Sequence, residues 1–375
     1  MTVYFDNSAT TKPCKEALDA ARYAAEECWG NPSSLHFAGC EANMLLRKSR
    51  KQVAALLKCQ PENFYFTSSG TTANNTAVFG AVEKLKKNGN RIVTTAFEHP
   101  SVLEPLKRIE NTGIEVIRIS PDKNGKINED EFLSSINENT ILVSCMAVNN
   151  EVGSVMPVSS IKSAVKRAEA PALIHSDCVQ AFGKIPVTPN SLGADIITVS
   201  AHKIHGFKGA GGIYLKDKTI IKPYILGGGQ ENSVFSGTEG MPAIAAFGAA
   251  AEAIGDISKN YAYVCKLKEK FVNAVKNNEK IKINSPVDSI PYIINISIYG
   301  LPSQPIVNFM SEKGICISAG SACKTGHRSQ VLTAMGLEPE TIDSAVRISL
   351  SRFNTEEEID ILTNAVLECA SKYGK

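Results

Sequence analysis

The stretch between residues 60 and 215 constrains the fold most strongly, because short runs of β-branched and aromatic residues alternate there with helix-like segments. Two neighbouring parallel strands must be joined by a crossover of a dozen or more residues, usually a helix. The alternation therefore predicts a large α/β domain with a mainly parallel seven-stranded sheet sandwiched by helices. The expected strands are NFYFTSS, RIVTTAF, IEVIRIS, ILVSCMAV, ALIHSD, DIITVSA and GGIYLK.

The segment between the first two strands, TTANNTAVFGAVEKLKKNGN, is a clear helix candidate. Val78, Phe79, Val82 and Leu85 fall on one face at helical spacing. A threonine at the start and Gly89 at the end are typical of helix boundaries. We therefore expect a strand, a turn and a helix in direct succession.

The pattern changes after residue 255. A Lys-rich amphipathic segment, YAYVCKLKEKFVNAVKNN, precedes the strand-like YIINISIYG and a terminal helical pattern, TEEEIDILTNAVLECASKY. A chain of 375 residues is also too long for one minimal core. We expect a large domain over residues 15–255 and a smaller α+β C-terminal domain formed by residues 1–14 and 256–375.

Charge and composition exclude several classes of protein. With 40 Lys plus Arg against 38 Asp plus Glu, the net charge of +2 gives no electrostatic reason for a nucleic-acid or membrane partner. Residues 242–251, the most apolar stretch, fall well short of the roughly 20 residues that cross a bilayer. The start, MTVYFDNSATTKP, lacks signal-peptide features, so we expect a cytoplasmic protein. The ten scattered cysteines predict no metal site.

The strongest local signal is DIITVSAHKIHGFKGAGG, in which a strand ends near Ser200, His202 and Lys203. An amine in a partly dry site can lose its proton and attack a carbonyl, as Schiff-base lysines do. Ser200 and His202 would then be placed to hold a phosphate. Taken alone, Lys203 is explained as well by a solvated lysine at a loop entrance.

The strand ALIHSD presents Asp177 at its end, and Gln180 follows. Pyridoxal phosphate withdraws electrons only while its ring nitrogen is protonated, and a buried carboxylate keeps the proton there. Gln180 has an amide that can donate to the phenolic oxygen of the same ring. A helix N-cap is the simpler explanation of Asp177.

Two further strand ends carry polar side chains. FYFTSSGTTANN places Thr71 at a strand-to-helix turn, where free N–H groups attract phosphate, although a plain capped helix has the same residues. TTAFEHPSV ends on Glu98 and His99, and an imidazole there can stack on a pyridine ring and move protons. A structural histidine is the alternative.

The C-terminal half adds two candidates. In ISAGSACKTGHRSQVL, Cys323 lies among Gly, Ser and Ala, with Lys324, His327 and Arg328 nearby, and cationic neighbours favour a reactive thiolate. In DSAVRISLSRF, Arg347 fits a strand and can bind a substrate carboxylate. A bystander cysteine and a surface arginine are the alternatives.

Taken in order, these motifs resemble the cysteine desulfurases, a branch of the class V aminotransferase-like, fold-type I pyridoxal-phosphate enzymes. The resemblance runs nearly from end to end. It is carried by YFDNSATT, GNPSS, FTSSGTTANN, FEHPSV, VNNEVG, HSDCVQAFGK, SAHKIHGFKG, GGGQE with SGTE, SAGSAC and RISLSRF.

The resemblance implies roles at the cofactor ring. Lys203 is similar to the lysine that binds pyridoxal 5'-phosphate covalently, and His99 to the ring-stacking acid and base. Asp177 matches the partner of the ring nitrogen, and Gln180 the contact to the phenolic oxygen.

Thr71, Ser200 and His202 match residues that bind the cofactor phosphate. Thr238 matches a phosphate contact that reaches across from a second subunit, so the resemblance implies a homodimer with a composite active site.

Substrate and sulfur are handled by a third group. Asn150 and Arg347 match residues that hold the substrate carboxylate, and Cys323 matches the sulfur acceptor. The implied reaction converts L-cysteine to L-alanine and leaves a persulfide on Cys323, from which an acceptor protein takes the sulfur, for example in iron–sulfur cluster assembly.

Thr72, Asn232, Phe235 and Gly240 depart from the family pattern but leave every reacting residue in place. They raise the possibility of a specialised paralogue. Two rival functions stay open: a selenocysteine or cysteine-sulfinate lyase of the same branch, and a non-catalytic scaffold. The presence of Cys323 argues against the first, and the retained reacting residues argue against the second.

Overall fold

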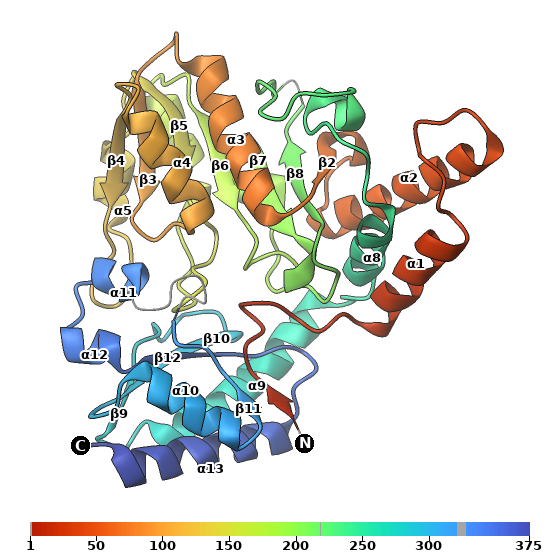
Figure 1. The fold of residues 1–375 in the computed structure, drawn as a ribbon. Helices are drawn as coiled ribbons and strands as arrows, with labels where there is room; N and C mark the ends of the chain where they lie inside the picture. The colour runs from red at the N-terminus through yellow and green to blue at the C-terminus, as the bar shows by residue number, and fades with distance from the viewer. Residues whose placement is uncertain (1, 218, 321–327) are drawn as a thin grey trace.

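The computed structural model describes residues 2–217, 219–320 and 328–375. Its centre is a seven-stranded sheet in the order β2-β8-β7-β6-β5-β3-β4 (Figure 1). Neighbouring strands from β4 to β7 are parallel, whereas β8 runs antiparallel to both β7 and β2. The predicted sheet is confirmed, with strands β2 (Phe64–Thr67), β3 (Arg91–Thr95), β4 (Glu115–Ile119), β5 (Thr140–Ser144), β6 (Leu173–Asp177), β7 (Ile196–Ser200) and β8 (Gly211–Leu215).

Helices cover both faces of this sheet because its strands are apolar on both faces. On β7, Ile196 belongs to one hydrophobic cluster, whereas Ile197 and Val199 belong to another. Helices α3 (Gly70–Leu85) and α4 (Pro100–Glu110) pack on the first face. The second face is covered by α1 (Lys15–Glu26), α2 (Phe37–Leu57), α6 (Val158–Arg167) and α8 (Met241–Glu252), with shorter helices α5 (Glu129–Ser134) and α7 (Pro189–Leu192) in connections.

Helix α3 was predicted correctly, but its two boundaries differ from the expectation. The N-cap is Ser69 rather than a threonine: Ser69 Oγ accepts from Thr72 N at 3.1 Å, and Thr72 Oγ1 accepts from Ser69 N at 2.9 Å. Thr72, a departure from the family pattern, therefore closes a capping box. The helix ends at Leu85, so Gly89 does not cap it. Gly89 instead allows a close backbone contact, since a Cβ there would lie 2.2 Å from Asn139 O.

A second group of elements lies below the sheet in Figure 1, where both termini are found. Strands β9 (Ile281–Ile283), β10 (Ile293–Ile298) and β12 (Ala345–Ser349) form an antiparallel sheet, and β1 (Val3–Tyr4) pairs in parallel with β11 (Ile315–Cys316). The helices are α9 (Ile257–Val275), α10 (Ser303–Glu312), α11 (Gln330–Ala334), α12 (Pro339–Asp343) and α13 (Glu356–Tyr373).

The predicted change of pattern after residue 255 coincides with the start of α9. The larger hydrophobic core is nevertheless a single cluster of contacting side chains, whose members range in sequence from Val3 to Ala370 and come from both groups of elements. The division into two domains therefore stays a prediction. Within the described ranges, no helix combines the length and the apolar character that a membrane span requires.

The segment after β1 joins the two parts. Ser8 N donates to Ser349 Oγ at 2.9 Å in the small sheet, and Thr11 N donates to His202 O at 2.9 Å at the end of β7. Residues 6–11 therefore cross from one part to the other along the carboxyl ends of the large sheet.

Candidate active site

The predicted side chains meet where the parallel strands end. Asp177 and Ser200 are the last residues of β6 and β7, and His99 follows β3. Because β2 runs in the same direction as β7 and α3 follows β2, the N-terminus of α3 lies at this edge too. Ligands of α/β sheets bind at such edges.

A cavity of about 810 Å³ lies here, a volume typical of small-molecule sites. Nine of the eleven predicted residues line it: Thr71, His99, Asn150, Asp177, Gln180, Ser200, His202, Lys203 and Arg347.

The other two predicted residues do not belong to this set. Cys323 lies outside the described residues, which resume at Arg328, and Arg328 itself lines the cavity. Thr238 is exposed and does not line the cavity of its own chain. Its proposed role in a second subunit stays a prediction.

Lys203 is held at the cavity by the backbone of the N-terminal segment. It ends the short 3-10 helix η2 (Ala201–Lys203), directly after β7. Its Nζ donates to Ser8 O at 2.5 Å and to Ala9 O at 2.7 Å. Sequence reasoning missed Ser8 and Ala9, because they act through carbonyl groups that every residue has.

Asp177 is a buried carboxylate with only 4% of its surface exposed. Oδ1 accepts from Val179 N at 2.9 Å, and Oδ2 accepts from Asn74 Nδ2 at 2.7 Å. No ion pair to Asp177 occurs in the part of the chain that the structure describes. A buried negative charge without a cation suits a ligand that brings a positively charged N–H group.

His99 is the N-cap of α4, and its orientation is fixed by Ser101. Nδ1 accepts from Ser101 N at 3.1 Å and lies 2.7 Å from Ser101 Oγ, which accepts from Asn74 Nδ2 at 2.8 Å. An imidazole that accepts at Nδ1 carries its proton on Nε2 when it is neutral. Burial lowers the pKa of His99, the charge of Asp177 opposes this shift, and the charge of Lys203 adds to it.

Asn74 therefore connects two predicted residues that lie far apart in sequence. It donates to Asp177 and, through Ser101, to His99. Its own Oδ1 accepts a short hydrogen bond from Thr198 Oγ1, which also lies 3.2 Å from His175 Nε2. The asparagine pair in the predicted helix start was a visible signal, but the sequence does not reveal its partners.

The N-terminus of α3 offers an anion site in the same cavity. Thr71 lines the cavity in the first turn, and Ser200 Oγ is buried with no hydrogen-bond partner within the described chain. An unpartnered hydroxyl beside the free N–H groups of a helix start fits a phosphate. Burial and the charge of Lys203 lower the pKa of His202 to about 4, so His202 is a neutral neighbour here.

Gly70 lets this helix start approach the end of β7. A Cβ at Gly70 would lie 3.0 Å from Val179 Cγ2 and 3.2 Å from Ser200 Cβ, tighter than ordinary contacts. The absence of a side chain therefore keeps the anion site close to Ser200.

Arg347 belongs to β12 and is 2% exposed. One terminal nitrogen donates to Asp6 Oδ1 at 3.0 Å and the other to Asn150 O at 3.0 Å, whereas Nε finds no acceptor among the residues described. Sequence reasoning missed Asp6, whose motif YFDNSATT gave no hint of a partner more than 300 residues away.

The Gly-rich stretch before α8 is anchored away from the cavity. Glu231, in the short helix η3 (Gln230–Ser233), is buried, binds Arg50 through two hydrogen bonds of 2.6 and 2.7 Å, and accepts from Phe66 N at 2.8 Å. The departures Asn232, Phe235 and Gly240 do not line the cavity either.

Residues 3–362 match the family model for class-V aminotransferases. The chain is 38% identical over 380 residues to a NifS/IcsS protein homolog of Lactobacillus delbrueckii subsp. bulgaricus, covering 100% of this chain and 98% of the relative. It is 34% identical to the cysteine desulfurase IscS of Methanosarcina thermophila, covering 99% and 92%. A solved structure of a NifS-like protein superimposes with a TM-score of 0.93 at 36% identity, covering 99% of this chain and 100% of that one.

Proposed function

This chain belongs to the class-V aminotransferase family and, within it, to the cysteine desulfurases, and we propose that it uses pyridoxal 5'-phosphate to convert L-cysteine to L-alanine while Cys323 takes the sulfur. The observation that carries the proposal is the convergence of nine predicted residues on one cavity of about 810 Å³. They come from strand ends spread over most of the chain.

The cavity fits the cofactor in three respects. Ser200 Oγ is unpartnered beside the start of α3, where a phosphate would bind, and Thr71 adds a hydroxyl. Asp177 has a buried charge for a protonated ring nitrogen. When bound, pyridoxal phosphate supplies an electron sink that allows the bond between Cα and hydrogen of the substrate to break.

The residues around the ring have distinct tasks in this proposal. Lys203 would hold the cofactor through Nζ at its aldehyde carbon, and Asp177 would keep a proton at the ring nitrogen. His99 would lie against the ring and would move a proton through Nε2, since Nδ1 is occupied by Ser101. Gln180 would offer its amide to the phenolic oxygen.

Arg347 and Asn150 bind the carboxylate of the incoming cysteine. The guanidinium of Arg347 is held by Asp6 and the Asn150 carbonyl, and its Nε has a remaining donor. A fixed guanidinium with a free N–H is well suited to a carboxylate, because both groups are planar.

Sulfur transfer is assigned to Cys323. Its thiolate attacks the substrate sulfur, so that a sulfur–sulfur bond forms as the bond between sulfur and Cβ breaks, and the remaining carbon skeleton takes up protons to become alanine. The persulfide is then open to attack by a thiol of an acceptor protein.

The homodimer is part of the same proposal. Thr238 is exposed and does not line the cavity of about 810 Å³ in its own chain, as expected if it serves a neighbour. Trp29 and Leu35, between α1 and α2, and Phe37, the first residue of α2, are 73%, 97% and 81% exposed. Large exposed apolar side chains near one another in the chain commonly belong to a protein interface, and a second copy of this chain is the occupant we propose.

Visible absorbance tests the function directly. Purified protein loaded with pyridoxal phosphate should be coloured, and added cysteine should change the spectrum and release alanine. The Cys323→Ala variant should keep the colour and the spectral change but form no protein persulfide and release no alanine. A protein that stays colourless with added cofactor would contradict the proposal, and undiminished alanine release by the variant would favour the lyase alternative.

A further inference from the structure

Lys184 is a buried amine that the proposed reaction does not use. It follows β6 and is 6% exposed, and none of the ion pairs among the described residues includes it. Its Nζ donates to Gln180 Oε1 at 2.7 Å and lies 5.9 Å from the centre of the Tyr292 ring. A buried lysine without a carboxylate is costly, so its position needs an explanation.

The hydrogen bond from Lys184 determines the orientation of the Gln180 amide, with Oε1 toward Lys184 and Nε2 toward Ser8 O. Lys184 has only donors to offer, so it requires Oε1, and Gln180 Nε2 is left to donate to Ser8 O at 3.0 Å. The same carbonyl accepts from Lys203 Nζ. A continuous chain of hydrogen bonds therefore runs from Lys184 through Gln180 and Ser8 to Lys203.

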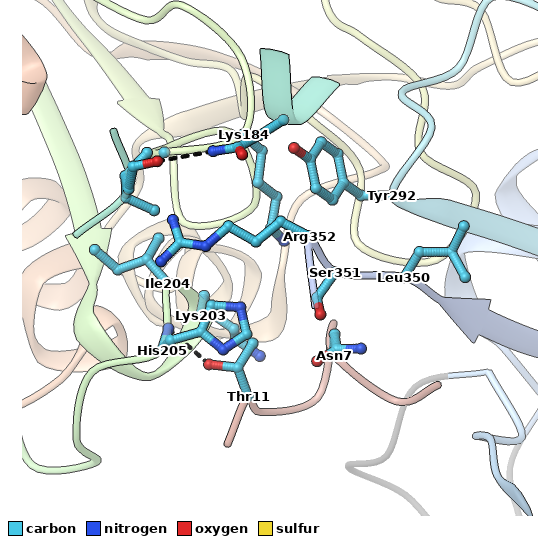
Figure 2. Close-up of a pocket in the computed structure, with 13 residues that line it drawn as sticks. Asn7, Thr11, Lys184, Lys203, Ile204, His205, Tyr292, Leu350, Ser351 and Arg352 are labelled. Carbon is cyan, nitrogen blue, oxygen red and sulfur yellow. Dashed lines mark hydrogen bonds between the residues drawn. The ribbon is translucent and has the colours of Figure 1, made fainter. Parts of the chain in front are cut away.

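The charge of Lys184 also reaches Lys203. A smaller cavity of about 20 Å³, the rear cavity, is lined by both lysines, by Arg352 and by Tyr292, which Figure 2 shows beside Lys184. No acidic residue lines it within the described ranges. The charged groups that line this smaller cavity are thus all cations, whereas the carboxyl groups near Lys203, such as that of Asp177, line the larger cavity. A like charge disfavours protonation of a neighbouring amine.

The titratable neighbours of Lys184 all act in the same direction. Burial first, and then the charges of Lys203 and Arg347, lower the pKa of Lys184 to about 7. Burial lowers the pKa values of His202 and His205 to about 4, and the charge of Lys184 is a smaller cause in the same direction. From this side Lys203 therefore meets the charge of Lys184 together with that of Arg352, which lines the same cavity.

We propose that Lys184 is a positioning residue for Lys203 and Gln180: it orients the amide that faces the cofactor ring and places a positive charge that favours loss of the proton from Lys203 Nζ. The inference rests on the proposed function, in which Lys203 binds the cofactor.

The test is a pH titration of the visible absorbance of the cofactor-loaded protein, which follows the proton on Lys203 Nζ and not turnover. In Lys184→Met the charge and the donor are lost at nearly constant length, so the titration midpoint should rise by about 0.5–1 pH unit. In Lys184→Arg the charge is permanent, so the midpoint should fall below that of the wild type.

Lys268→Met is the matched control. Lys268, in α9, is also largely buried, and it donates to Ser289 Oγ at 2.7 Å, but it lines neither cavity. Its replacement should remove a buried amine without moving the midpoint. A shift in Lys268→Met as large as that in Lys184→Met would show that loosened packing, not position, is responsible.

Two results would overturn the inference: equal midpoints in Lys184→Met and the wild type, or a midpoint in Lys184→Arg at or above that of the wild type. If Lys184→Met does not fold, the direction in which the titration midpoint moves in Lys184→Arg tests the inference. A wild-type protein that takes up no coloured cofactor would instead overturn the proposed function and this inference with it. A coloured wild type with unmoved variants overturns only the inference.

Discussion

Two sides of the same cavity are built in different ways. The floor, formed by Asn74, His99, Ser101 and Asp177, is one connected network in which each polar side chain binds another. The wall, formed by Asp6, Asn150 and Arg347, joins three distant parts of the chain around a buried guanidinium whose Nε has no acceptor within the described residues.

The difference suits two kinds of ligand. A closed hydrogen-bond network that joins a strand end with the first turns of two helices holds its side chains in one geometry, as a permanently bound cofactor requires. A buried cation with an unused donor keeps part of its binding capacity for an anion that enters and leaves. In the proposed function the cofactor would bind at the floor and the substrate carboxylate at the wall, and variants on each side test this division.

The largest effect is expected from Lys203→Ala, since Lys203 is the proposed covalent attachment point of the cofactor. The variant should lose turnover and the borohydride-reducible link to the cofactor, because no other amine is proposed to bind the aldehyde. Reduction with borohydride followed by mass spectrometry measures the link. A reducible link and wild-type alanine release in the variant would remove Lys203 from the mechanism.

The second effect concerns how well the floor excludes water. His175 is connected to Asn74 of the floor through Thr198. It is fully buried, with Ser144 Oγ at 2.9 Å and Thr198 Oγ1 at 3.2 Å from its ring nitrogens, and burial lowers its pKa to about 4. Between pH 6.5 and 4, His175 is protonated in the unfolded chain but stays neutral in the folded protein. The free energy of unfolding should therefore fall as the pH falls from about 6.5 to about 4, by up to about 3 kcal/mol for this residue.

Urea unfolding between pH 8 and 5 measures this dependence. Glu98 has the opposite effect on the pH dependence of the unfolding free energy, because burial raises its pKa to about 8. The contribution of the histidine is therefore obtained by comparing His175→Asn with the wild type. The unfolding free energy of the variant should change less with pH. His36→Asn, which replaces an exposed histidine, is the control and should follow the wild type; an unchanged slope in His175→Asn would mean that water reaches the floor.

The smallest of the three effects belongs to the wall. Arg347→Lys keeps a positive charge but loses the planar set of donors, at a loss of about 1.5–3 kcal/mol for a charge-assisted hydrogen bond. The KM for cysteine should rise roughly 10- to 100-fold, with the cofactor spectrum unchanged. Steady-state alanine release and absorbance together test this. Loss of colour in step with the rise in KM would show that wall and floor are not independent.

Most of the large sheet could be predicted from the sequence, because its strands are short runs of apolar and β-branched residues separated by segments long enough for parallel crossovers. The site residues could be predicted because Asp177, Ser200 and His99 follow such runs, and parallel strands end at one edge. Ser8 and Ala9 could not, since a carbonyl leaves no mark in the sequence. Asp6 and Lys184 could not either, because their partners depend on tertiary packing.

The crossing of residues 6–11 over the large sheet has a consequence for synthesis. Ser8 is made 341 residues before its partner Ser349. At 5–20 residues per second, that delay is roughly 20–70 s. The last strand of the large sheet ends at Leu215, but the contacts of Ser8 with Ser349 and of Asp6 with Arg347 can form only after residues 347–349 have been made. The wall of the cavity is therefore completed well after the large sheet.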